Sequence, residues 1–172
     1  MSDDKFNLER FVRRQKEDYD RAYKELLEES KRSHWMWWIF PQITGLGQSR
    51  MTESYFEGTA RHGCRAPRSN MMTSTSQEYS IKSMAEAKAY LEHPVLGKNI
   101  REISKLLTTI NQSNASIVFG YPDDLKLRSS MTLFAEAAES DEDRNIFLKV
   151  LDKFFDGKKD TRTLEILKQI GE

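Results

Sequence analysis

The segment Ser33-His34-Trp35-Met36-Trp37-Trp38-Ile39-Phe40-Pro41-Gln42 decides the fold of this chain. All three tryptophans of the protein fall within four consecutive residues here, and methionine, isoleucine and phenylalanine fill the gaps. An aromatic side chain buries roughly 150–250 Å², so a soluble fold has to enclose this segment. Ser33 as N-cap and Pro41 as terminator predict a short helix. The polar ends, His34 and Gln42, then need partners or a ligand.

Apolar residues recur at helical spacing through most of the remaining chain. The stretches with this spacing are 8–30, 83–91, 95–110, 117–119, 131–139, 140–157 and 160–170. The stripe over 95–110 is the most regular and predicts a central core helix. Ser83 with Glu86 forms a capping box, and Asp160 caps the last helix. With no convincing strand pattern, we predict an all-α fold: a single multihelical domain over residues 1–172.

One long segment departs from this pattern. Residues 48–80 contain no leucine, isoleucine or valine, so they cannot bury enough apolar surface to offset the entropy cost of ordering. We therefore predict a long, disordered, low-hydrophobicity insertion over residues 50–77. Its His62 and Cys64 make a poor metal or nucleophile site in such a segment, and we predict no metal site.

Composition excludes several classes of function. Lys plus Arg and Asp plus Glu are both 27, so the net charge is zero, which argues against a nucleic-acid binder. No apolar run approaches the ~20 residues of a membrane span, and the first residues lack the apolar region of a secretory signal. Cys64 is the single cysteine, which excludes an internal disulfide and favours the cytoplasm. The turn Gly45-Leu46-Gly47 lacks the third glycine of a dinucleotide loop, so no cofactor is predicted.

The stretch Asp123–Thr132 is the main candidate for ligand binding. A helix starting there would present free N–H groups and a partial positive charge to an anion. Its side chains Lys126, Arg128, Ser129 and Ser130 would add cations and hydroxyl donors. The alternative is that Asp123 and Asp124 neutralise these cations and the stretch is only a capped helix start.

His34 is the candidate for proton transfer, with Asp124 as the carboxylate that would orient it. Gln42, at the other end of the tryptophan segment, is a candidate ligand-binding residue. The structural alternative for His34 is a cap of the tryptophan-rich helix, bonded to a backbone carbonyl. A methionine and aromatic cluster at helical spacing is more often core than a stacking platform for a ring.

Long stretches of the chain resemble a known family. They are 8–12, 33–43, 45–47, 93–97, 123–134 and 160–164, and they are similar to the domain of unknown function 1810 family. The resemblance covers almost the whole chain and implies a multihelical cytosolic domain without an established activity. Some members carry the label calpastatin, but no feature here supports protease inhibition, and we do not adopt it.

The chain departs from this family between Gly47 and Ile81, where family members have a much shorter connector. Our hypothesis is that most of residues 50–77 is an extra segment, with intron sequence translated through a gene-model error as one explanation. Sequencing the mature transcript tests it, since a message encoding all of 50–77 contradicts the error.

Two functions follow as hypotheses. The first is binding of, or action on, a small anionic molecule in a pocket between the tryptophan-rich helix and Asp123–Thr132. The second is a non-catalytic interaction or structural domain, in which these motifs are core and helix caps. Neither predicts a membrane partner, and the oligomeric state and any catalysis stay open.

Overall fold

The computed structural model describes residues 4–46 and 75–171, which contain eight labelled helices and a further helical turn over residues 75–78. The labelled helices are α1 (Glu9–Leu27), α2 (Met36–Ile39), α5 (Met84–Glu92), α6 (Leu96–Thr109), α7 (Ala115–Phe119), α8 (Asp123–Ala137), α9 (Asp141–Phe155) and α10 (Thr161–Ile170). Within these residues, extended pairing is limited to one parallel bridge between Ile43 and Ile81. The all-α prediction is confirmed.

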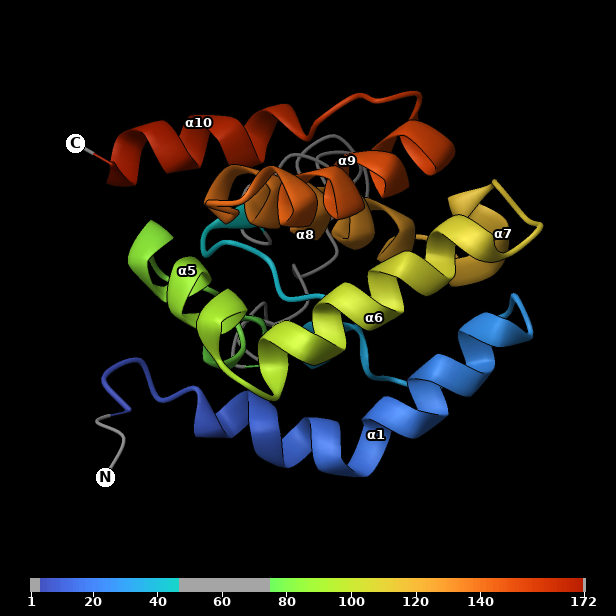
Figure 1. The fold of residues 1–172 in the computed structure, drawn as a ribbon, viewed down its shortest axis with the longest axis horizontal. Coiled ribbons are helices and arrows are strands. Elements are labelled where there is room, and N and C mark those ends of the chain that lie inside the picture. The colour runs from blue at the N-terminus through green and yellow to red at the C-terminus, as the bar shows by residue number, and fades with distance from the viewer. Residues whose placement is uncertain (1–3, 47–74, 172) are drawn as a thin grey trace, which may run out of the picture.

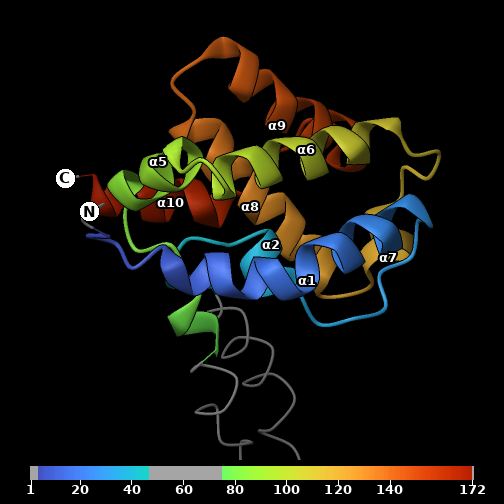
Figure 2. The ribbon, with the colours of Figure 1, turned by 60° about the horizontal axis from the view of Figure 1, so that its bottom comes forward.

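The helices are arranged around α8, which packs against α5, α7, α9 and α10 (Figure 1). Figure 2 shows α1 with α2 along one side of the molecule, α9 on the opposite side and α8 between them. The helix α6 packs against α1, α5 and α9. The most central helix is therefore α8, and residues 95–110 form a second core helix, α6, as their apolar stripe predicted.

The amino-acid composition of α8 explains why its central position is hard to predict. Its buried positions lie on every face and include small polar side chains, so no apolar stripe marks it. These positions are Asp124, Leu127, Ser129, Ser130, Met131, Thr132, Leu133, Phe134, Ala135 and Ala137. Two of the polar ones, Ser129 and Thr132, bond to residues about thirty positions further along the chain, which a local pattern does not reveal.

The tryptophan segment is largely core, as its size requires. Trp35 and Trp38 are buried, and Trp37 is half-buried. The Trp35 ring packs edge-on against Phe119 of α7 with centroids 6.4 Å apart. The helix begins at Met36 with Trp35 in the N-cap position, so the expected capping role of Ser33 was wrong. The Ser33 hydroxyl instead donates to a carboxylate of α1.

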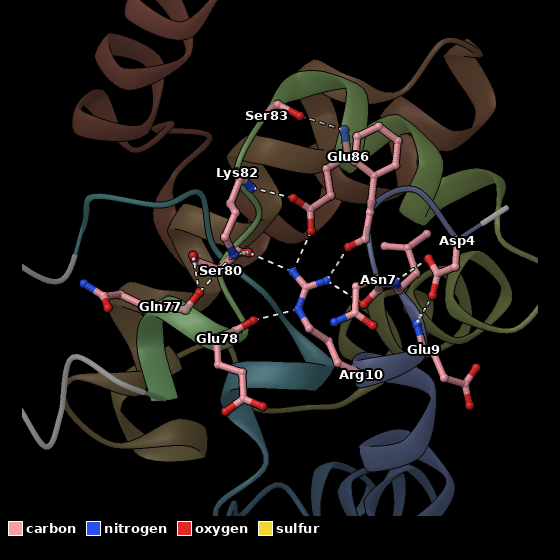
Figure 3. Close-up of polar contacts among 12 residues, drawn as sticks. Asp4, Asn7, Glu9, Arg10, Gln77, Glu78, Ser80, Lys82, Ser83 and Glu86 are labelled. Carbon is pink, nitrogen blue, oxygen red and sulfur yellow. Dashed lines mark hydrogen bonds and ion pairs between the residues drawn. The ribbon is translucent and has the colours of Figure 1, made fainter.

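Arg10 joins three separate segments, as Figure 3 shows. Its guanidinium donates to the carbonyl oxygens of Phe6 and Asn7 at 2.7 Å, and of Glu78 at 2.6 Å. It also donates to the Ser80 carbonyl at 3.1 Å and to a carboxylate oxygen of Glu86 at 2.6 Å. All five N–H groups of the guanidinium are thereby used, and the start of α1 is tied to α5.

The predicted insertion lies mostly outside the described residues. Residues 50–74 are not among them, and residues 75–77 belong to a helical turn over 75–78. The chain on either side is joined by the parallel bridge, in which the Ile81 N–H donates to the Gln42 carbonyl at 2.8 Å. The Thr44 N–H returns a bond to the Ile81 carbonyl, also at 2.8 Å. Residues 42–44 are thus held beside residue 81.

Candidate functional site

The helix α8 begins at Asp123, eight residues before the start predicted at Met131. Its first N–H groups already have acceptors: that of Asp124 donates to the Gly120 carbonyl, and that of Lys126 to the Pro122 carbonyl. Arg128, Ser129 and Ser130 therefore lie inside the helix, beyond the terminal N–H groups. The early start has a physical reason, because two hydroxyls of this stretch bond to the segment 160–163: that of Ser129 lies 2.9 Å from the Thr163 hydroxyl, and that of Thr132 accepts from the Asp160 N–H at 2.9 Å.

Two of the predicted ligand-binding residues face the segment before α10. Arg128 donates to the carbonyl oxygens of Lys158 at 2.9 Å and Lys159 at 3.0 Å. The buried Ser129 hydroxyl lies 2.9 Å from the Thr163 hydroxyl. These bonds fasten α10 to α8, which gives both residues a structural task.

The two remaining polar residues of the stretch are buried. Asp124 is 8% exposed and accepts a hydrogen bond from the Ser116 hydroxyl of α7 at 2.8 Å. The Ser130 hydroxyl is also buried and has no hydrogen-bond partner in the described part of the chain. His34 is exposed, and no hydrogen bond joins it to any described residue, Asp124 included. The proposed pairing of His34 with Asp124 is therefore not formed in this structure.

Lys126 is the residue of this stretch that faces the tryptophan segment. Its ammonium lies 3.8 Å from the centre of the Trp37 ring and 3.0 Å from a carboxylate oxygen of Asp123. The ammonium of Lys31 contacts the other oxygen of Asp123 at 2.7 Å. Burial alone would raise the pKa of Asp123, but the bonds from the two lysines outweigh it and lower that pKa. The cluster of two lysines and one carboxylate keeps a surplus positive charge.

A small cavity of about 80 Å³ lies on another side of Trp37. Gln42 lines it, and no hydrogen bond within the described residues engages the Gln42 side-chain amide. The other side chains around it mix hydroxyl, amide and aromatic groups. They include Trp37, Thr44, Gln77, Tyr79 and Ser80. Of the predicted site residues, the structure thus gathers Gln42 and Lys126 around Trp37, while Asp124, Arg128 and Ser129 bond elsewhere.

A larger open groove, of about 580 Å³, borders the Arg10 contacts. Its charged floor is the Arg10–Glu86 ion pair, whose side chains are 10% and 3% exposed. Glu86 also accepts a bond from the Lys82 N–H at 2.8 Å, so both of its carboxylate oxygens are engaged. The Arg10–Glu86 pair is therefore already satisfied and has no free group for a ligand.

Glu25 of α1 is a residue that the sequence reasoning missed. It is 6% exposed, and one oxygen accepts bonds from the N–H groups of Arg32 at 3.0 Å and Ser33 at 3.2 Å. The same oxygen accepts from the Trp35 indole at 2.7 Å, and the other oxygen accepts from the Ser33 hydroxyl. These four bonds hold the backbone before His34 and the Trp35 side chain after it. The signal was a glutamate on the apolar stripe of α1, directly before Leu26.

The ionisation of the Glu25 carboxylate should make the free energy of unfolding depend on pH. Burial would raise the pKa of Glu25, but the four hydrogen bonds overcome it and bring the pKa to about 2, from an ordinary 4.5. The ionised form therefore contributes about 3 kcal/mol, fully present above pH ~4.5 and lost as the pH falls to ~2. We expect Glu25→Gln to lower the free energy of unfolding by about 2–3 kcal/mol at neutral pH in urea titrations.

The difference between wild type and Glu25→Gln should shrink as the pH falls from 4.5 towards 2. Glu17→Gln is the matched control, since Glu17 is exposed on the same helix and forms no ion pair with the described residues. A difference between wild type and Glu25→Gln that stays constant across this pH range would contradict the assignment.

Residues 4–46 and 75–171 contain no group of three or more histidine, cysteine, aspartate or glutamate side chains placed to bind a metal ion. No helix in the same ranges has the length and apolar character needed to cross a membrane.

Comparisons with known proteins give a family and a structural relative. A family model described as "Protein of unknown function (DUF1810)" matches residues 5–62 and 68–167. The chain is similar to the crystal structure of a conserved hypothetical protein from Mycobacterium tuberculosis, at 36% identity and a TM-score of 0.77. That match covers 96% of this chain and 99% of the other. No curated protein matches the sequence.

Proposed function

This chain belongs to the DUF1810 family, a family of unknown function, and we propose from its geometry that it binds a small polar molecule with an anionic group beside Trp37. The observation that carries the proposal is the cavity next to Trp37, with Lys126 over the same indole. We place this binding in the cytoplasm, because a chain with a single cysteine has no disulfide framework suited to an oxidising compartment.

The chemistry of the cavity supports a ligand that forms hydrogen bonds. The Gln42 amide offers both donors and an acceptor, and Thr44 and Ser80 add hydroxyls. The surplus positive charge of Lys31 and Lys126 around Asp123 favours an anion next to it. Trp37 connects the two regions, because it lines the cavity and also contacts the Lys126 ammonium.

The size of the cavity limits the ligand. Sites for whole cofactors or drug-sized molecules measure roughly 300–1,000 Å³, and this cavity has about 80 Å³. It therefore accommodates one polar group, such as an amide, a carboxylate or a sugar hydroxyl. The rest of the molecule would lie across Trp37, with its anionic group at Lys126.

The second candidate function is a non-catalytic interaction or structural domain. It is favoured by the internal bonds of Asp124, Arg128 and Ser129, which join α8 to α7 and to the segment before α10. Under this hypothesis the exposed His34 has no role in proton transfer.

A thermal-shift screen with nucleotides, sugar phosphates and carboxylates separates the two. A ligand at a hundred times its Kd stabilises the folded state by ~2.7 kcal/mol. We expect one ligand class to raise the Tm, and Gln42→Ala to weaken its binding about tenfold through the loss of one or two hydrogen bonds. Lys126→Ala should weaken anionic members of that class more than neutral ones.

Gln169→Ala and Lys168→Ala are the matched controls, since both residues are exposed near the end of α10. They should leave the ligand affinity unchanged. Failure of every ligand class to raise the Tm, or equal affinity in Gln42→Ala and Gln169→Ala, would favour the structural alternative.

A further inference from the structure

We propose that Arg14 of α1 binds an oxyanion, a carboxylate or a phosphate, through the two terminal nitrogens of its guanidinium. Tyr79 also lines the cavity beside Trp37, but Arg14 does not, so Arg14→Lys tests this site independently of that cavity. If Arg14 binds no oxyanion, the function proposed for the cavity is unaffected. If the cavity binds no ligand, the proposal for Arg14 is likewise unaffected.

The guanidinium of Arg14 is held on an aromatic platform. Its Nε donates to the Tyr79 hydroxyl at 2.9 Å, and its central carbon lies 4.9 Å from the centre of the Trp38 ring. The same carbon lies 5.8 Å from the centre of the Tyr79 ring. The cation thus contacts two rings and is oriented by one hydrogen bond, although the residue itself is exposed.

The platform is itself fixed by its neighbours. Trp38 and Tyr79 are both buried, and their rings meet edge to face with centroids 5.2 Å apart. The Trp38 indole donates to an Asp18 oxygen at 3.0 Å, and the Tyr79 ring packs edge-on against Phe11. Immobilising a flexible side chain costs roughly 0.5–1.5 kcal/mol on binding. Much of that cost is already met for Arg14 in the free protein.

The terminal nitrogens of Arg14 distinguish it from the other arginines. Every other arginine in the described part of the chain has a carboxylate or carbonyl oxygen as partner. Arg101, for example, is bidentate to Asp143 at 2.8 and 2.9 Å, and Arg128 bonds two carbonyls. Arg14 has only the Tyr79 hydroxyl among described residues. Its planar pair of terminal nitrogens is the geometry that suits a carboxylate or phosphate.

The groups near Arg14 favour its cationic form without forming an ion pair with its guanidinium. The bond to Tyr79, together with the nearby charges of Glu17 and Asp18, raises the pKa of Arg14 above its ordinary value. The Asp18 carboxylate has other partners, because one oxygen accepts from the Trp38 indole and the other pairs with Arg21 at 3.3 Å. No carboxylate therefore covers the open side of the Arg14 guanidinium in the described structure.

The test is an NMR titration of the full chain with inorganic phosphate and, separately, with acetate, at constant ionic strength in chloride. The Trp38 indole N–H is the reporter, because its ring contacts the Arg14 guanidinium and Trp38 is retained in every variant. We expect a saturable shift of the Trp38 indole N–H resonance. Arg14→Lys should weaken binding about fivefold, since it keeps the charge but loses the planar pair of terminal nitrogens. Tyr79→Phe should weaken binding about twofold, because the Arg14 Nε loses its hydrogen-bond partner.

Arg13→Lys is the control, because Arg13 is the adjacent arginine, 79% exposed at its side chain. It should bind as wild type does. Saturation by phosphate alone, by acetate alone or by both supports the site and identifies the source of the oxyanion. A shift that does not saturate, or equal weakening in Arg13→Lys and Arg14→Lys, overturns it.

Discussion

Gly97→Ala is expected to destabilise the protein by at least about 2–3 kcal/mol, although alanine is the better helix former by roughly 1 kcal/mol. Gly97 lies in the first turn of α6, where α5 approaches closely. A Cβ built there would lie 2.0 Å from the Leu91 carbonyl oxygen and 2.9 Å from its carbon. Real carbon–oxygen contacts do not reach such distances, so the main chain of α5 would have to move.

The displacement would also affect an ion pair. The same Leu91 carbonyl accepts a bond from Arg101 at 3.0 Å, and the guanidinium of Arg101 in turn holds Asp143 of α9. A Cβ on Gly97 would lie 2.8 Å from that guanidinium. Moving α5 therefore disturbs the contact between α6 and α9 as well.

Urea unfolding measures the effect, with Gly171→Ala as the control. Gly171 is at the end of α10, and the nearest atom to its added Cβ would be 3.1 Å away. We expect Gly171→Ala to change the free energy of unfolding by less than about 0.5 kcal/mol. A Gly97→Ala variant as stable as wild type would show that helix propensity outweighs the close approach.

Arg10→Ala is expected to lower the free energy of unfolding by about 3–5 kcal/mol, the usual loss when one partner of a buried ion pair is removed. The change leaves the Glu86 carboxylate without its cation in a site where the side chain is 3% exposed. It also leaves the carbonyls of Phe6, Asn7, Glu78 and Ser80 without their donor (Figure 3).

A double-mutant cycle in urea separates these contributions. Arg10→Ala with Glu86→Ala should cost less than the sum of the single changes, because the double variant holds no unpaired buried charge. Arg13→Ala, which removes an exposed pair with Glu9, should cost no more than about 1 kcal/mol. Additive single changes, or equal losses for Arg10→Ala and Arg13→Ala, would contradict the role of Arg10 as the joint of three segments.

How far the sequence predicts this fold depends on the range of the interactions. The boundaries of α1, α6 and α9 agree with their apolar stripes within a few residues, because one face of each helix is core. The Ser83 half of the predicted capping box also holds, since its hydroxyl accepts from the Glu86 N–H at 3.1 Å, whereas the Glu86 carboxylate accepts from Lys82 and Arg10 instead of Ser83. The start of α8 was missed, because the partners of its hydroxyls lie about thirty residues further along the chain.

The candidate site also depends on contacts between segments that are far apart in the sequence. Residues that are unusual in the sequence, such as Arg128 and Ser129, prove to recognise another unusual stretch, residues 158–163. The stretch that suggested a ligand thus bonds to the start of α10 and the residues before it. Conversely, Glu25 and Arg14 carried no motif, and their placement beside Ser33 and Trp38 depends on tertiary contacts alone.

The parallel bridge between Ile43 and Ile81 has a consequence for how this family can vary in length. Because it holds residues 42–44 beside residue 81, the two sides of this junction lie close together in the described structure. The entropy of closing a flexible loop rises only logarithmically, by about 0.6 kcal/mol for each doubling of its length. Proteins with short and long connectors at this junction can therefore share one helical body, and evolution can lengthen the chain here with little loss of stability.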